Sequence, residues 1–455
     1  MVEDRRVEPL FILPPYFFFD YICEDMSNGK VRIAAVGLGN RTCKYLSYVS
    51  DHRDVAEVVA LVDPDASRMN GARAGFSISE DRCFSSLDEL VASGIEVDAC
   101  IVGTPDKFHH ELTIKALRAG WHVLLEKPMG QTEEQCREIV QASIETGKMV
   151  TVCYVLRYHP YFMKLKQLSE DPRMGRILSV RHVERVGRDR TAHTFVRGPW
   201  NMKEMNTTVF FTKCCHDVDF VLWLTGGEVR SVSSTVGTRI FTAENAPAGA
   251  GKRCLDCMIE QTCPYSAVDL YLRRRDWIKG FTPYPGETQD DMLMRILKES
   301  RYGRCVYDCP ENDVIDRQTM TLELTSGITA EIIMECVTDE KDRLTIIECE
   351  NAVISGDESC INVAFRNSSQ NLHADPLSTE AAGSPAAPGF PAAPDSSAAQ
   401  ETYDFSWTRN KPFHAGADLL IIQEFLDAVR SGSLQTRTPA QTSLSSHLLC
   451  LHAEK

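Results

Sequence analysis

The stretch His122-Val-Leu-Leu-Glu-Lys-Pro-Met-Gly130 decides the fold of this chain. Its apolar segment, residues 123–125, predicts a buried parallel strand. Glu126, Lys127 and Pro128 follow at the carboxyl end of that strand, where open α/β sheets bind their ligands. Proline biases the preceding residue toward extended geometry, so the backbone would aim the Lys127 ammonium. Lys127 is therefore a candidate catalytic residue, and the alternative is a solvated lysine at a surface strand end.

A glycine-rich turn upstream supplies the context of a dinucleotide site. Val31 to Val36 is an apolar run that leads into Gly37-Leu-Gly39-Asn-Arg-Thr42, and a helical pattern follows. The first glycine permits a tight turn, the second lets the backbone approach a pyrophosphate, and the helix N-terminus offers free N–H groups to the anion. Thr42 replaces the usual third glycine, so its β-branch must be accommodated where helix and strand touch.

Asp63 ends the next apolar strand, Ala56 to Asp63, roughly two dozen residues after Gly37. A carboxylate at this position can accept hydrogen bonds from the adenosine ribose hydroxyls and repels a 2′-phosphate. The sequence therefore favours NAD over NADP, although Arg68 lies nearby. The alternative is that Asp63 and Pro64 form a turn after the strand.

Further strands and helices continue the alternation. The predicted strands are Val97–Thr104 and Met149–Val155, and the predicted helices are Phe108–Ala119 and Thr132–Thr146. Their order and spacing predict a doubly wound parallel sheet, with a Rossmann domain over residues 30–155.

These motifs together resemble the glucose–fructose oxidoreductase, inositol dehydrogenase and MocA (Gfo/Idh/MocA) family. The resemblance is carried by G-L-G-N-R at 37–41, Asp63, Thr104-Pro105-x-x-x-His109 and Glu126-Lys127-Pro128. It covers roughly residues 30–365 and resumes near 403. It implies an α/β fold in which a Rossmann domain precedes a C-terminal α/β domain with an open, mainly antiparallel sheet.

The resemblance also implies an activity and a set of contacts. Family members typically oxidise or reduce a hydroxyl carbon of a sugar or cyclitol with NAD(P). Thr104 and Pro105 would line the nicotinamide side, and His109 would cap the helix below it. Glu126 and Lys127 would face the nicotinamide ribose and the substrate. The implied cofactor-binding residues are Gly37, Gly39, Asn40, Arg41, Asp63, Thr104, Pro105, His109, Glu126 and Lys127.

Residues 156–365 are predicted to form the second domain, for substrate binding and oligomerisation. The segments that alternate as half-buried strands are Ile177–Val186, Val229–Phe241, Thr319–Val337 and Leu344–Ile354. Such a sheet can form a substrate wall or the face of a homo-oligomer. Arg157 follows the last Rossmann strand and either reaches the substrate or packs in the hinge.

A second chemical centre lies between Thr212 and Gly226. His216, Asp219 and Trp223 fall on one helical face, and Gly226 is a helix stop. A histidine on an apolar helix is usually a core residue. The resemblance instead implies that His216 faces the reacting carbon, and that a carboxylate stands four residues earlier. Here that position is Thr212, and Lys213 follows it as a candidate substrate contact.

The resulting hypothesis is an oxidoreductase that acts on a sugar-like or polyol substrate. His216 would take the hydroxyl proton, since imidazole titrates near neutral pH. Lys127 would hydrogen-bond the same oxygen or relay the proton. Two alternatives remain on this fold: a redox-neutral NAD-dependent enzyme that cleaves glycosidic bonds, and a non-catalytic regulator that senses NAD and sugar.

Cysteines in a polar loop, 250–310, differ from the apolar cysteines elsewhere. Cys254-x-x-Cys257 is the spacing that lets two thiolates reach one ion, and Cys263 follows. A structural zinc ion would take Cys305 as its fourth ligand, with Cys309 as the alternate. A branch of the resembled family carries a similar segment. Reduced surface thiols or a redox-active pair are the alternatives.

The remaining segments predict less. Residues 366–402 are rich in Pro, Ala and Ser and predict a disordered insertion. Residues 403–455 contain two predicted amphipathic helices, Gly416–Ser431 and Gln441–Glu454, and the second is expected to be cut short. Residues 1–29 are interpreted as an extension that precedes the fold.

Composition narrows the partners. The chain has 455 residues and a net charge of −15, which disfavours nucleic-acid and anionic-membrane partners. Its cysteines lie mostly in apolar runs, as expected for reduced thiols in the cytoplasm, and no segment predicts a membrane span.

Overall fold

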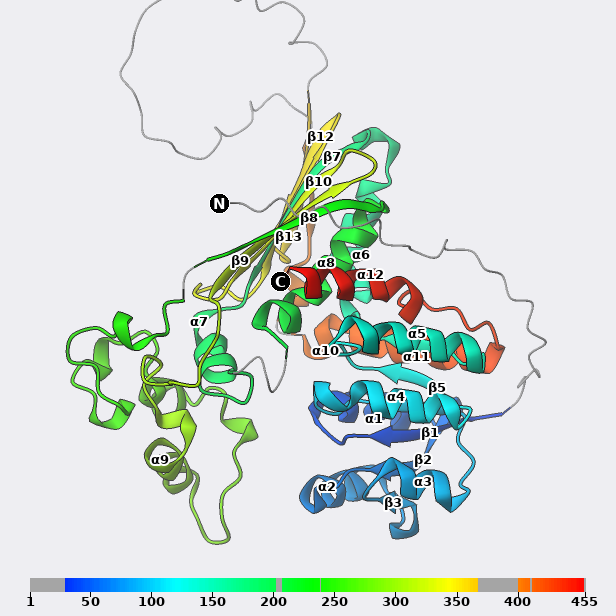
Figure 1. Ribbon diagram of the computed structural model, residues 1–455, viewed down its shortest axis with the longest axis horizontal. Coiled ribbons are helices and arrows are strands. Elements are labelled where there is room, and N and C mark those ends of the chain that lie inside the picture. Colours follow the sequence, from blue (N-terminus) through cyan, green and yellow to red (C-terminus); the bar gives the residue numbers. More distant parts are fainter. Residues whose placement is uncertain (1–28, 202–206, 238, 367–399, 410, 454–455) are drawn as a thin grey trace, which may run out of the picture.

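A computed structural model of the chain describes residues 29–201, 207–237, 239–366, 400–409 and 411–453 (Figure 1). The predicted extension at 1–29 and the predicted insertion at 366–402 lie almost entirely outside these described residues.

The N-terminal part contains a six-stranded parallel sheet, in the order β3-β2-β1-β4-β5-β6. Its strands are β1 Val31–Val36, β2 Ala56–Val62, β3 Cys83–Phe84, β4 Ala99–Val102, β5 His122–Leu125 and β6 Val150–Val152. Its helices are α1 Asn40–Asp51, α2 Ala66–Phe76, α3 Leu87–Ser93, α4 His109–Arg118 and α5 Glu133–Thr146. This order is that of the doubly wound dinucleotide-binding sheet. The predicted Rossmann fold is therefore confirmed.

Apolar runs explain why this sheet has two covered faces. Strands β4 and β5 are almost completely buried. One hydrophobic core joins them to α3, α4 and α5, and a second core joins the opposite face to α1 and α2. Thr42, which replaces the third glycine, is buried against Gly103. A Cβ at residue 103 would lie 2.2 Å from Thr42 Oγ1, so the missing side chain of Gly103 accommodates the β-branch.

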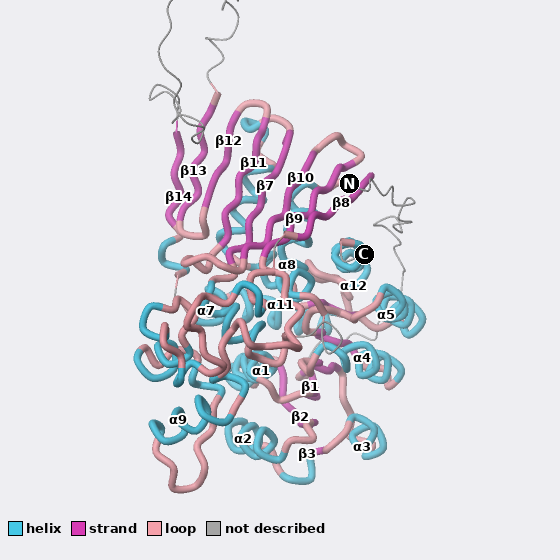
Figure 2. The backbone as a smooth tube through the Cα atoms, turned by 60° about the vertical axis from the view of Figure 1, so that its left-hand side comes forward, coloured by secondary structure: helices cyan, strands magenta, loops and turns pink. Residues whose placement is uncertain are grey.

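The C-terminal part contains an eight-stranded, mainly antiparallel sheet, in the order β14-β13-β12-β11-β7-β10-β9-β8 (Figure 2). Its strands are β7 Ile177–Arg185, β8 Val229–Val236, β9 Arg317–Leu324, β10 Thr329–Glu335, β11 Arg343–Cys349, β12 Ala352–Gly356, β13 Cys360–Phe365 and β14 Gln400–Asp404. Among the described strands of this C-terminal sheet, only β7 and β10 pair in parallel. The predicted open, mainly antiparallel sheet is confirmed.

Some predicted strands of this sheet differ from the structure. The segment Thr319–Val337 is a hairpin, β9 and β10, that turns near Gly327, where φ is +88°. The segment Leu344–Ile354 is likewise a hairpin of β11 and β12. The strand predicted to reach Phe241 ends at Val236.

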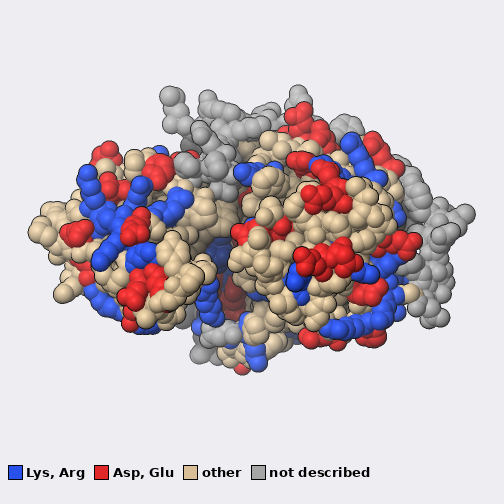
Figure 3. Space-filling model, turned by 90° about the horizontal axis from the view of Figure 1, so that it is seen from below, with Lys and Arg blue, Asp and Glu red and all other residues tan. Residues whose placement is uncertain are grey.

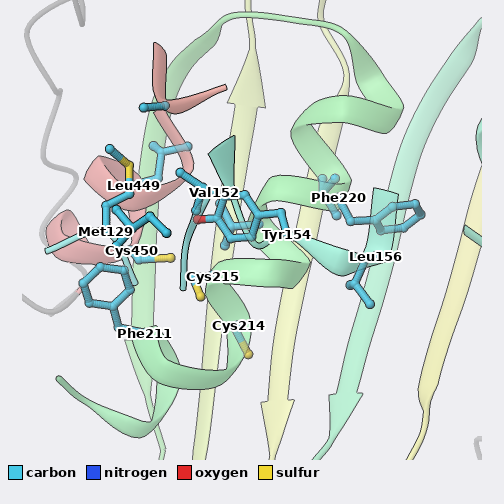
Figure 4. Packing of buried hydrophobic residues seen from close by; sticks show 14 of the residues in the cluster. Met129, Val152, Tyr154, Leu156, Phe211, Cys214, Cys215, Phe220, Leu449 and Cys450 are labelled. Atoms are coloured by element: carbon cyan, nitrogen blue, oxygen red, sulfur yellow. The ribbon is translucent and has the colours of Figure 1, made fainter. Parts of the chain in front are cut away.

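Helices α6 Pro160–Ser169 and α8 Val209–Thr225 cover one face of the C-terminal sheet (Figure 1). Thr208 caps α8, since its side chain accepts a hydrogen bond from Phe211 N, and Gly226 ends the helix with φ +62°. Figure 4 shows Tyr154, which follows β6, beside Cys215 of α8. The two parts of the molecule therefore share one hydrophobic core at α8.

The last helices return to the Rossmann part. They are α10 Pro412–Ala415, α11 Ala417–Ser431 and α12 Ala440–His452. Buried residues of α11 join the core on the α1 face, and α12 contacts α5 and α8. No described helix is long and apolar enough to cross a membrane.

Residues 239–310 form a lobe beside the sheet that contains the predicted cysteine loop (Figure 1). Its main helix is α9, Gln289–Glu299, and its core includes Cys254 and Tyr271. The short helix α7, Arg188–Arg190, and a π-helix at Thr191–Val196 follow β7 toward this lobe.

Candidate active site

The glycine turn has the geometry that a pyrophosphate requires. Gly37 adopts φ +80°, and a Cβ there would lie 2.6 Å from the Thr104 side chain. Gly39 caps α1 without a side-chain hydrogen bond, so the first N–H groups of that helix are available to an anion. Thr104 Oγ1 is buried and has no hydrogen-bond partner within the described residues. These features fit a bound dinucleotide.

Asp63 follows β2 as predicted, but Arg68 occupies its carboxylate. Arg68 Nε and Nη2 donate to Asp63 at 3.0 and 2.9 Å, and Leu38 N donates at 2.8 Å. Burial alone would raise the pKa of Asp63, but the hydrogen bonds from Arg68 and the backbone outweigh it and lower that pKa. Arg68 thus fills acceptor positions that the sequence assigns to the ribose hydroxyls.

His109 links two loops at the carboxyl edge of the sheet. Its ring nitrogens lie 2.8 Å from Thr104 O and 2.6 Å from Pro128 O. The side chain is buried. His109 therefore holds the loop that carries Thr104 and Pro105 against the loop that carries Lys127.

Arg41 and Glu126, both predicted to contact the cofactor, pair with each other. Arg41 Nε lies 2.7 Å from Glu126 Oε1, and Arg41 Nη2 lies 2.8 Å from Asp418 of α11. Burial would raise the pKa of Glu126, but Arg41 and Tyr45 lower it. Asp418 is not among the predicted site residues, because it is one of three acidic residues in α11 and no motif distinguishes it.

Lys127 lies against the helix that carries His216. Its Nζ donates to Thr212 O at 2.7 Å, and Thr212 Oγ1 lies 2.8 Å from Thr207 Oγ1. The position where the resemblance implies a carboxylate therefore holds a hydroxyl that is paired with another threonine. The hydrogen bond from Lys127 joins the end of β5 to α8.

His216 is a neutral imidazole in this site. Burial lowers its pKa well below the ordinary value, and the positive charges of Lys127 and Arg343 lower it further. The Tyr154 ring packs edge-on at 5.6 Å between centroids, and His216 Nδ1 has no hydrogen-bond partner among the described residues. Nδ1 of the unprotonated ring is therefore available to accept a hydrogen bond from a ligand.

The Arg157 side chain makes its hydrogen bonds to other residues of the protein interior. Its Nε and Nη2 donate to the two carboxylate oxygens of Asp219 at 2.8 and 2.7 Å, and its Nη1 donates to Arg437 O at 2.9 Å. The side chain is buried, so these contacts favour the hinge-packing interpretation over substrate contact.

Lys213 pairs with Glu184 of β7 at 2.9 Å. Burial lowers the pKa of Lys213, and the nearby Arg190 guanidinium adds to the effect. Arg343 of β11 lies 3.0 Å from the same Glu184 and 2.5 Å from Asp217. Lys213 thus belongs to a charged network between α8 and the sheet.

The cysteine loop brings the predicted ligands into one region of the lobe. Cys305 N donates to Lys252 O at 2.9 Å, which places the segment around Cys305 beside that of Cys254. Cys254 and Cys257 both influence the pKa values of Cys263 and Cys305, which burial raises first of all. All these thiols are free.

Two sulfurs accept backbone hydrogen bonds: Cys254 from Ala267 N and Cys257 from Gly251 N, each at 3.4 Å. Nevertheless, no three His, Cys, Asp or Glu side chains within the described ranges form a group that could hold a metal ion. Cys309 instead donates to Cys305 O at 3.3 Å. The sulfurs are therefore neighbours but not an assembled ligand set.

Two family models match consecutive parts of the chain. Residues 31–154 match the model described as "Oxidoreductase family, NAD-binding Rossmann fold", and residues 162–251 match the "GFO/IDH/MocA C-terminal domain". The chain thus matches the models of both domains of the Gfo/Idh/MocA family. The family predicted from the motifs at the two strand ends is thus confirmed.

Curated relatives within the Gfo/Idh/MocA family include inositol 2-dehydrogenases. The one from Arthrobacter sp. (strain FB24) is 30% identical over 220 residues, which are 48% of this chain and 60% of that protein. Inositol 2-dehydrogenase 4 of Saccharopolyspora erythraea is 29% identical over 49% of this chain and 62% of its own length. The chain thus spans about 60% of the length of these relatives.

Solved structures share the Gfo/Idh/MocA fold. An oxidoreductase from Agrobacterium radiobacter, solved with NAD+, L-tartaric acid and magnesium, has a TM-score of 0.64 at 15% identity, over 94% of this chain and 96% of that one. The WlbA dehydrogenase from Bordetella pertussis, solved with NADH and UDP-GlcNAcA, has a TM-score of 0.58 at 19% identity, over 93% and 95%. At these identities the likeness supports the fold alone.

Proposed function

We propose that this chain is an NAD(P)-dependent oxidoreductase that acts on a hydroxyl carbon of a sugar-like or cyclitol substrate. The observation that carries the proposal is the hydrogen bond from Lys127 Nζ to Thr212 O, because it brings the Rossmann strand end to the helix that bears His216. The relatives named inositol 2-dehydrogenase support the substrate class.

Bound NAD would accept the hydride, and the residues of the chain would handle the proton. His216, neutral at working pH, accepts the proton of the substrate hydroxyl. Lys127 donates a hydrogen bond to the same oxygen and stabilises its negative charge while the C–H bond breaks. Gly39 and the N-terminus of α1 would hold the pyrophosphate, and Arg41 keeps Glu126 ionised beside Lys127.

A panel of sugars and cyclitols, incubated with the protein and NAD, tests the proposal. Net formation of NADH, followed by absorbance, is the expected result. Release of a cleaved sugar without a net change in NADH would support the redox-neutral alternative, and NAD binding with neither outcome would support the sensor.

NAD is the proposed preferred cofactor, since Asp63 places negative charge beside the adenosine ribose. Asp63→Ala should narrow the difference in affinity between NAD and NADP. Arg68→Ala should widen it, because Arg68 now neutralises the carboxylate. Calorimetric titrations of both cofactors measure these affinities, with the exposed Asp88→Ala as the control. A native preference for NADP would contradict the proposal.

A structural zinc ion in the lobe is a separate proposal, with Cys254, Cys257, Cys263 and Cys305 as ligands. The proposal is supported by the proximity of these thiols, since Cys254 and Cys257 influence the pKa values of Cys263 and Cys305. Binding of a zinc ion would have to bring the four sulfurs closer together. The Cys257→Ser variant should then lose the zinc ion and keep its affinity for NAD. The control variant Cys360→Ser, which lies outside the lobe, should keep the zinc ion. Metal analysis of protein prepared without added zinc, yielding far below one equivalent, would refute the site.

The outer face of the C-terminal sheet is the proposed surface of a homo-oligomer. Ile346 of β11, 39% exposed, pairs in register with exposed Arg181 of β7 on that face. Light scattering should give a molecular mass above that of one chain, and Ile346→Lys should reduce that mass.

The cytoplasmic location expected from the cysteines is likewise a proposal, and it agrees with the free state of every described cysteine.

A further inference from the structure

The peptide group between Pro128 and Met129, directly after Lys127, is hydrogen-bonded on both sides by buried histidines. Its carbonyl oxygen, Pro128 O, lies 2.6 Å from Nδ1 of His109. Its N–H, on Met129, donates to Nε2 of His447 at 2.8 Å. His109 begins α4, whereas His447 lies on α12, 318 positions away from Met129. We refer to His109 and His447 as the histidine pair.

The two contacts require opposite roles of the two rings. A carbonyl oxygen only accepts, so Nδ1 of His109 must carry a proton. A backbone N–H only donates, so Nε2 of His447 must be unprotonated, and the proton of that neutral ring must lie on Nδ1. Nδ1 of His447 lies 2.9 Å from Ser443 O, one turn earlier on α12, and can donate to it. His447 is therefore held in one tautomer.

His447 remains an acceptor at neutral pH because its ring is buried. Burial lowers the pKa of His447 to about 4. The hydrogen bond to Ser443 O opposes this shift, whereas the positive charge of Lys127 adds to it. A second proton would place an N–H against the N–H of Met129. The ring therefore stays neutral, and its contact with Met129 is retained.

Lys127 lies between two fixed points of the backbone. On its N-terminal side, Glu126 N donates to Val102 O at 2.9 Å, which continues the sheet past the end of β5. On its C-terminal side, the ring of Pro128 fixes φ, and the next peptide group is the one held by the histidine pair. Few backbone torsions remain free between these points. The direction of the Lys127 side chain toward Thr212 O is therefore set from behind.

Tyr154 connects His447 to the second proposed catalytic residue. Its ring packs against both imidazoles, with centroids 5.4 Å from His447 and 5.6 Å from His216. Its hydroxyl oxygen lies 2.8 Å from Nδ1 of His447, and Ser446 Oγ donates to that hydroxyl at 3.2 Å. His447 therefore adjoins the Lys127 loop directly and His216 through one ring.

We propose that His447 is a positioning residue, which fixes the Lys127 amine for the reaction by accepting the hydrogen bond from Met129 N. This inference rests on the proposed function, since it concerns the lysine that would bind the substrate hydroxyl. It makes α12 a support of the active site, although no motif in that helix predicts such a role. A misplacement of about 1 Å can lower a rate about 100-fold, so a hydrogen bond lost behind the lysine should affect kcat.

Two substitutions separate the acceptor of His447 from its bulk. In His447→Gln, the side-chain Oε1 can accept from Met129 N in place of Nε2, whereas His447→Leu has no acceptor. His447→Leu should lower kcat about 10- to 100-fold and change KM and NAD affinity less than about 3-fold. His447→Gln should restore kcat to within about 3-fold of the parent.

Two further variants control for damage to the fold. His447→Asn keeps a donor for Ser443 O but is too short to reach Met129 N, so it should lose kcat as His447→Leu does, even if His447→Leu does not fold. Ser446→Ala is the matched control, because it removes a buried hydroxyl from the same helix without touching Met129. It should keep the parent kcat.

Lys127 keeps contact with solvent, although the residues behind it are buried. Its side chain is half-buried, whereas His109 and His447 are 1% and 0% exposed. Figure 3 shows a recess between the lobe and the Rossmann part, with basic and acidic side chains at its floor. Because part of Lys127 is accessible, a small acylating reagent can report the position of its amine without any turnover.

Acetic anhydride labelling, followed by peptide mass spectrometry, provides this second measurement. Lys127 should be acetylated about 3- to 10-fold faster in His447→Leu and His447→Asn than in the parent, the range for the loss of one net hydrogen bond. Its rate in His447→Gln and Ser446→Ala should equal the parent rate. Lys298, exposed on α9, is the internal reference for the reagent.

The two measurements separate this inference from the proposed function. Parent values of kcat and of Lys127 labelling in His447→Leu and His447→Asn would overturn the positioning role. An equal loss of kcat in Ser446→Ala would also overturn it, because the effect would then belong to the packing of α12. If the parent formed no NADH with any substrate, the proposed function would fail, whereas faster labelling of Lys127 in His447→Asn would still support the positioning of that amine by His447.

Discussion

Replacing Lys127 by alanine is expected to lower kcat/KM by about two to four powers of ten, the range for loss of an acid–base or oxyanion-stabilising group. The variant lacks the ammonium that hydrogen-bonds Thr212 O and would face the reacting oxygen. NAD affinity should be retained, because the glycine turn and α1, which are proposed to bind the pyrophosphate, are unchanged in this variant. Steady-state turnover of the best substrate, with calorimetry of NAD, measures both quantities.

The pH profile of the same variant distinguishes catalysis from structural damage. The positive charge of Lys127 lowers the pKa of His216, so its removal should raise that pKa. The base is then protonated at higher pH, and the acid limb of kcat/KM should move toward neutral pH. Lys298→Ala, exposed on α9, should leave rate and profile unchanged. Turnover by Lys127→Ala at the parent rate, with NAD bound, would exclude the proposed role.

The Rossmann part could be predicted from the sequence because its strands and turns are determined by residues that lie close together along the chain. Residues 123–125 are apolar because both faces of that strand are covered, and Gly37 is required where φ is positive. The C-terminal sheet was less predictable. Polar and apolar residues alternate with the same period on both strands of a hairpin, so the pattern predicts one strand over Thr319–Val337, across the turn at Gly327.

The site depends on contacts that a sequence pattern does not contain. Asp418 reaches Arg41 across 377 positions, and Arg343 reaches Asp217 across 126. Gly103 explains why Thr42 is tolerated, but its role is visible only when β4 lies against α1. Motifs thus locate Lys127 and His216, whereas their charged surroundings require the folded chain.

Arg157→Met is expected to lower the free energy of unfolding by about 3–5 kcal/mol, the usual effect of leaving one member of a buried ion pair. Arg157 makes a bidentate contact with Asp219, and both side chains are nearly inaccessible, at 10% and 1%. Chemical denaturation measures the change. Burial already raises the pKa of Asp219, and without Arg157 it should rise further.

The sign of the pH dependence follows from that shift. A carboxyl whose pKa is raised in the folded state binds its proton more tightly there, so its contribution to stability is lost as pH rises. The deficit of Arg157→Met should therefore be smaller at acidic than at alkaline pH, because protonation removes the unpaired charge of Asp219. The double variant Arg157→Met/Asp219→Leu should recover most of the loss and its pH dependence, because no unpaired charge remains. If the double variant were as unstable as the sum of the single ones, the ion pair would not be the cause. Packing of the Arg157 side chain against Trp223, whose ring centroid lies 5.8 Å from the guanidinium carbon, would then account for the loss.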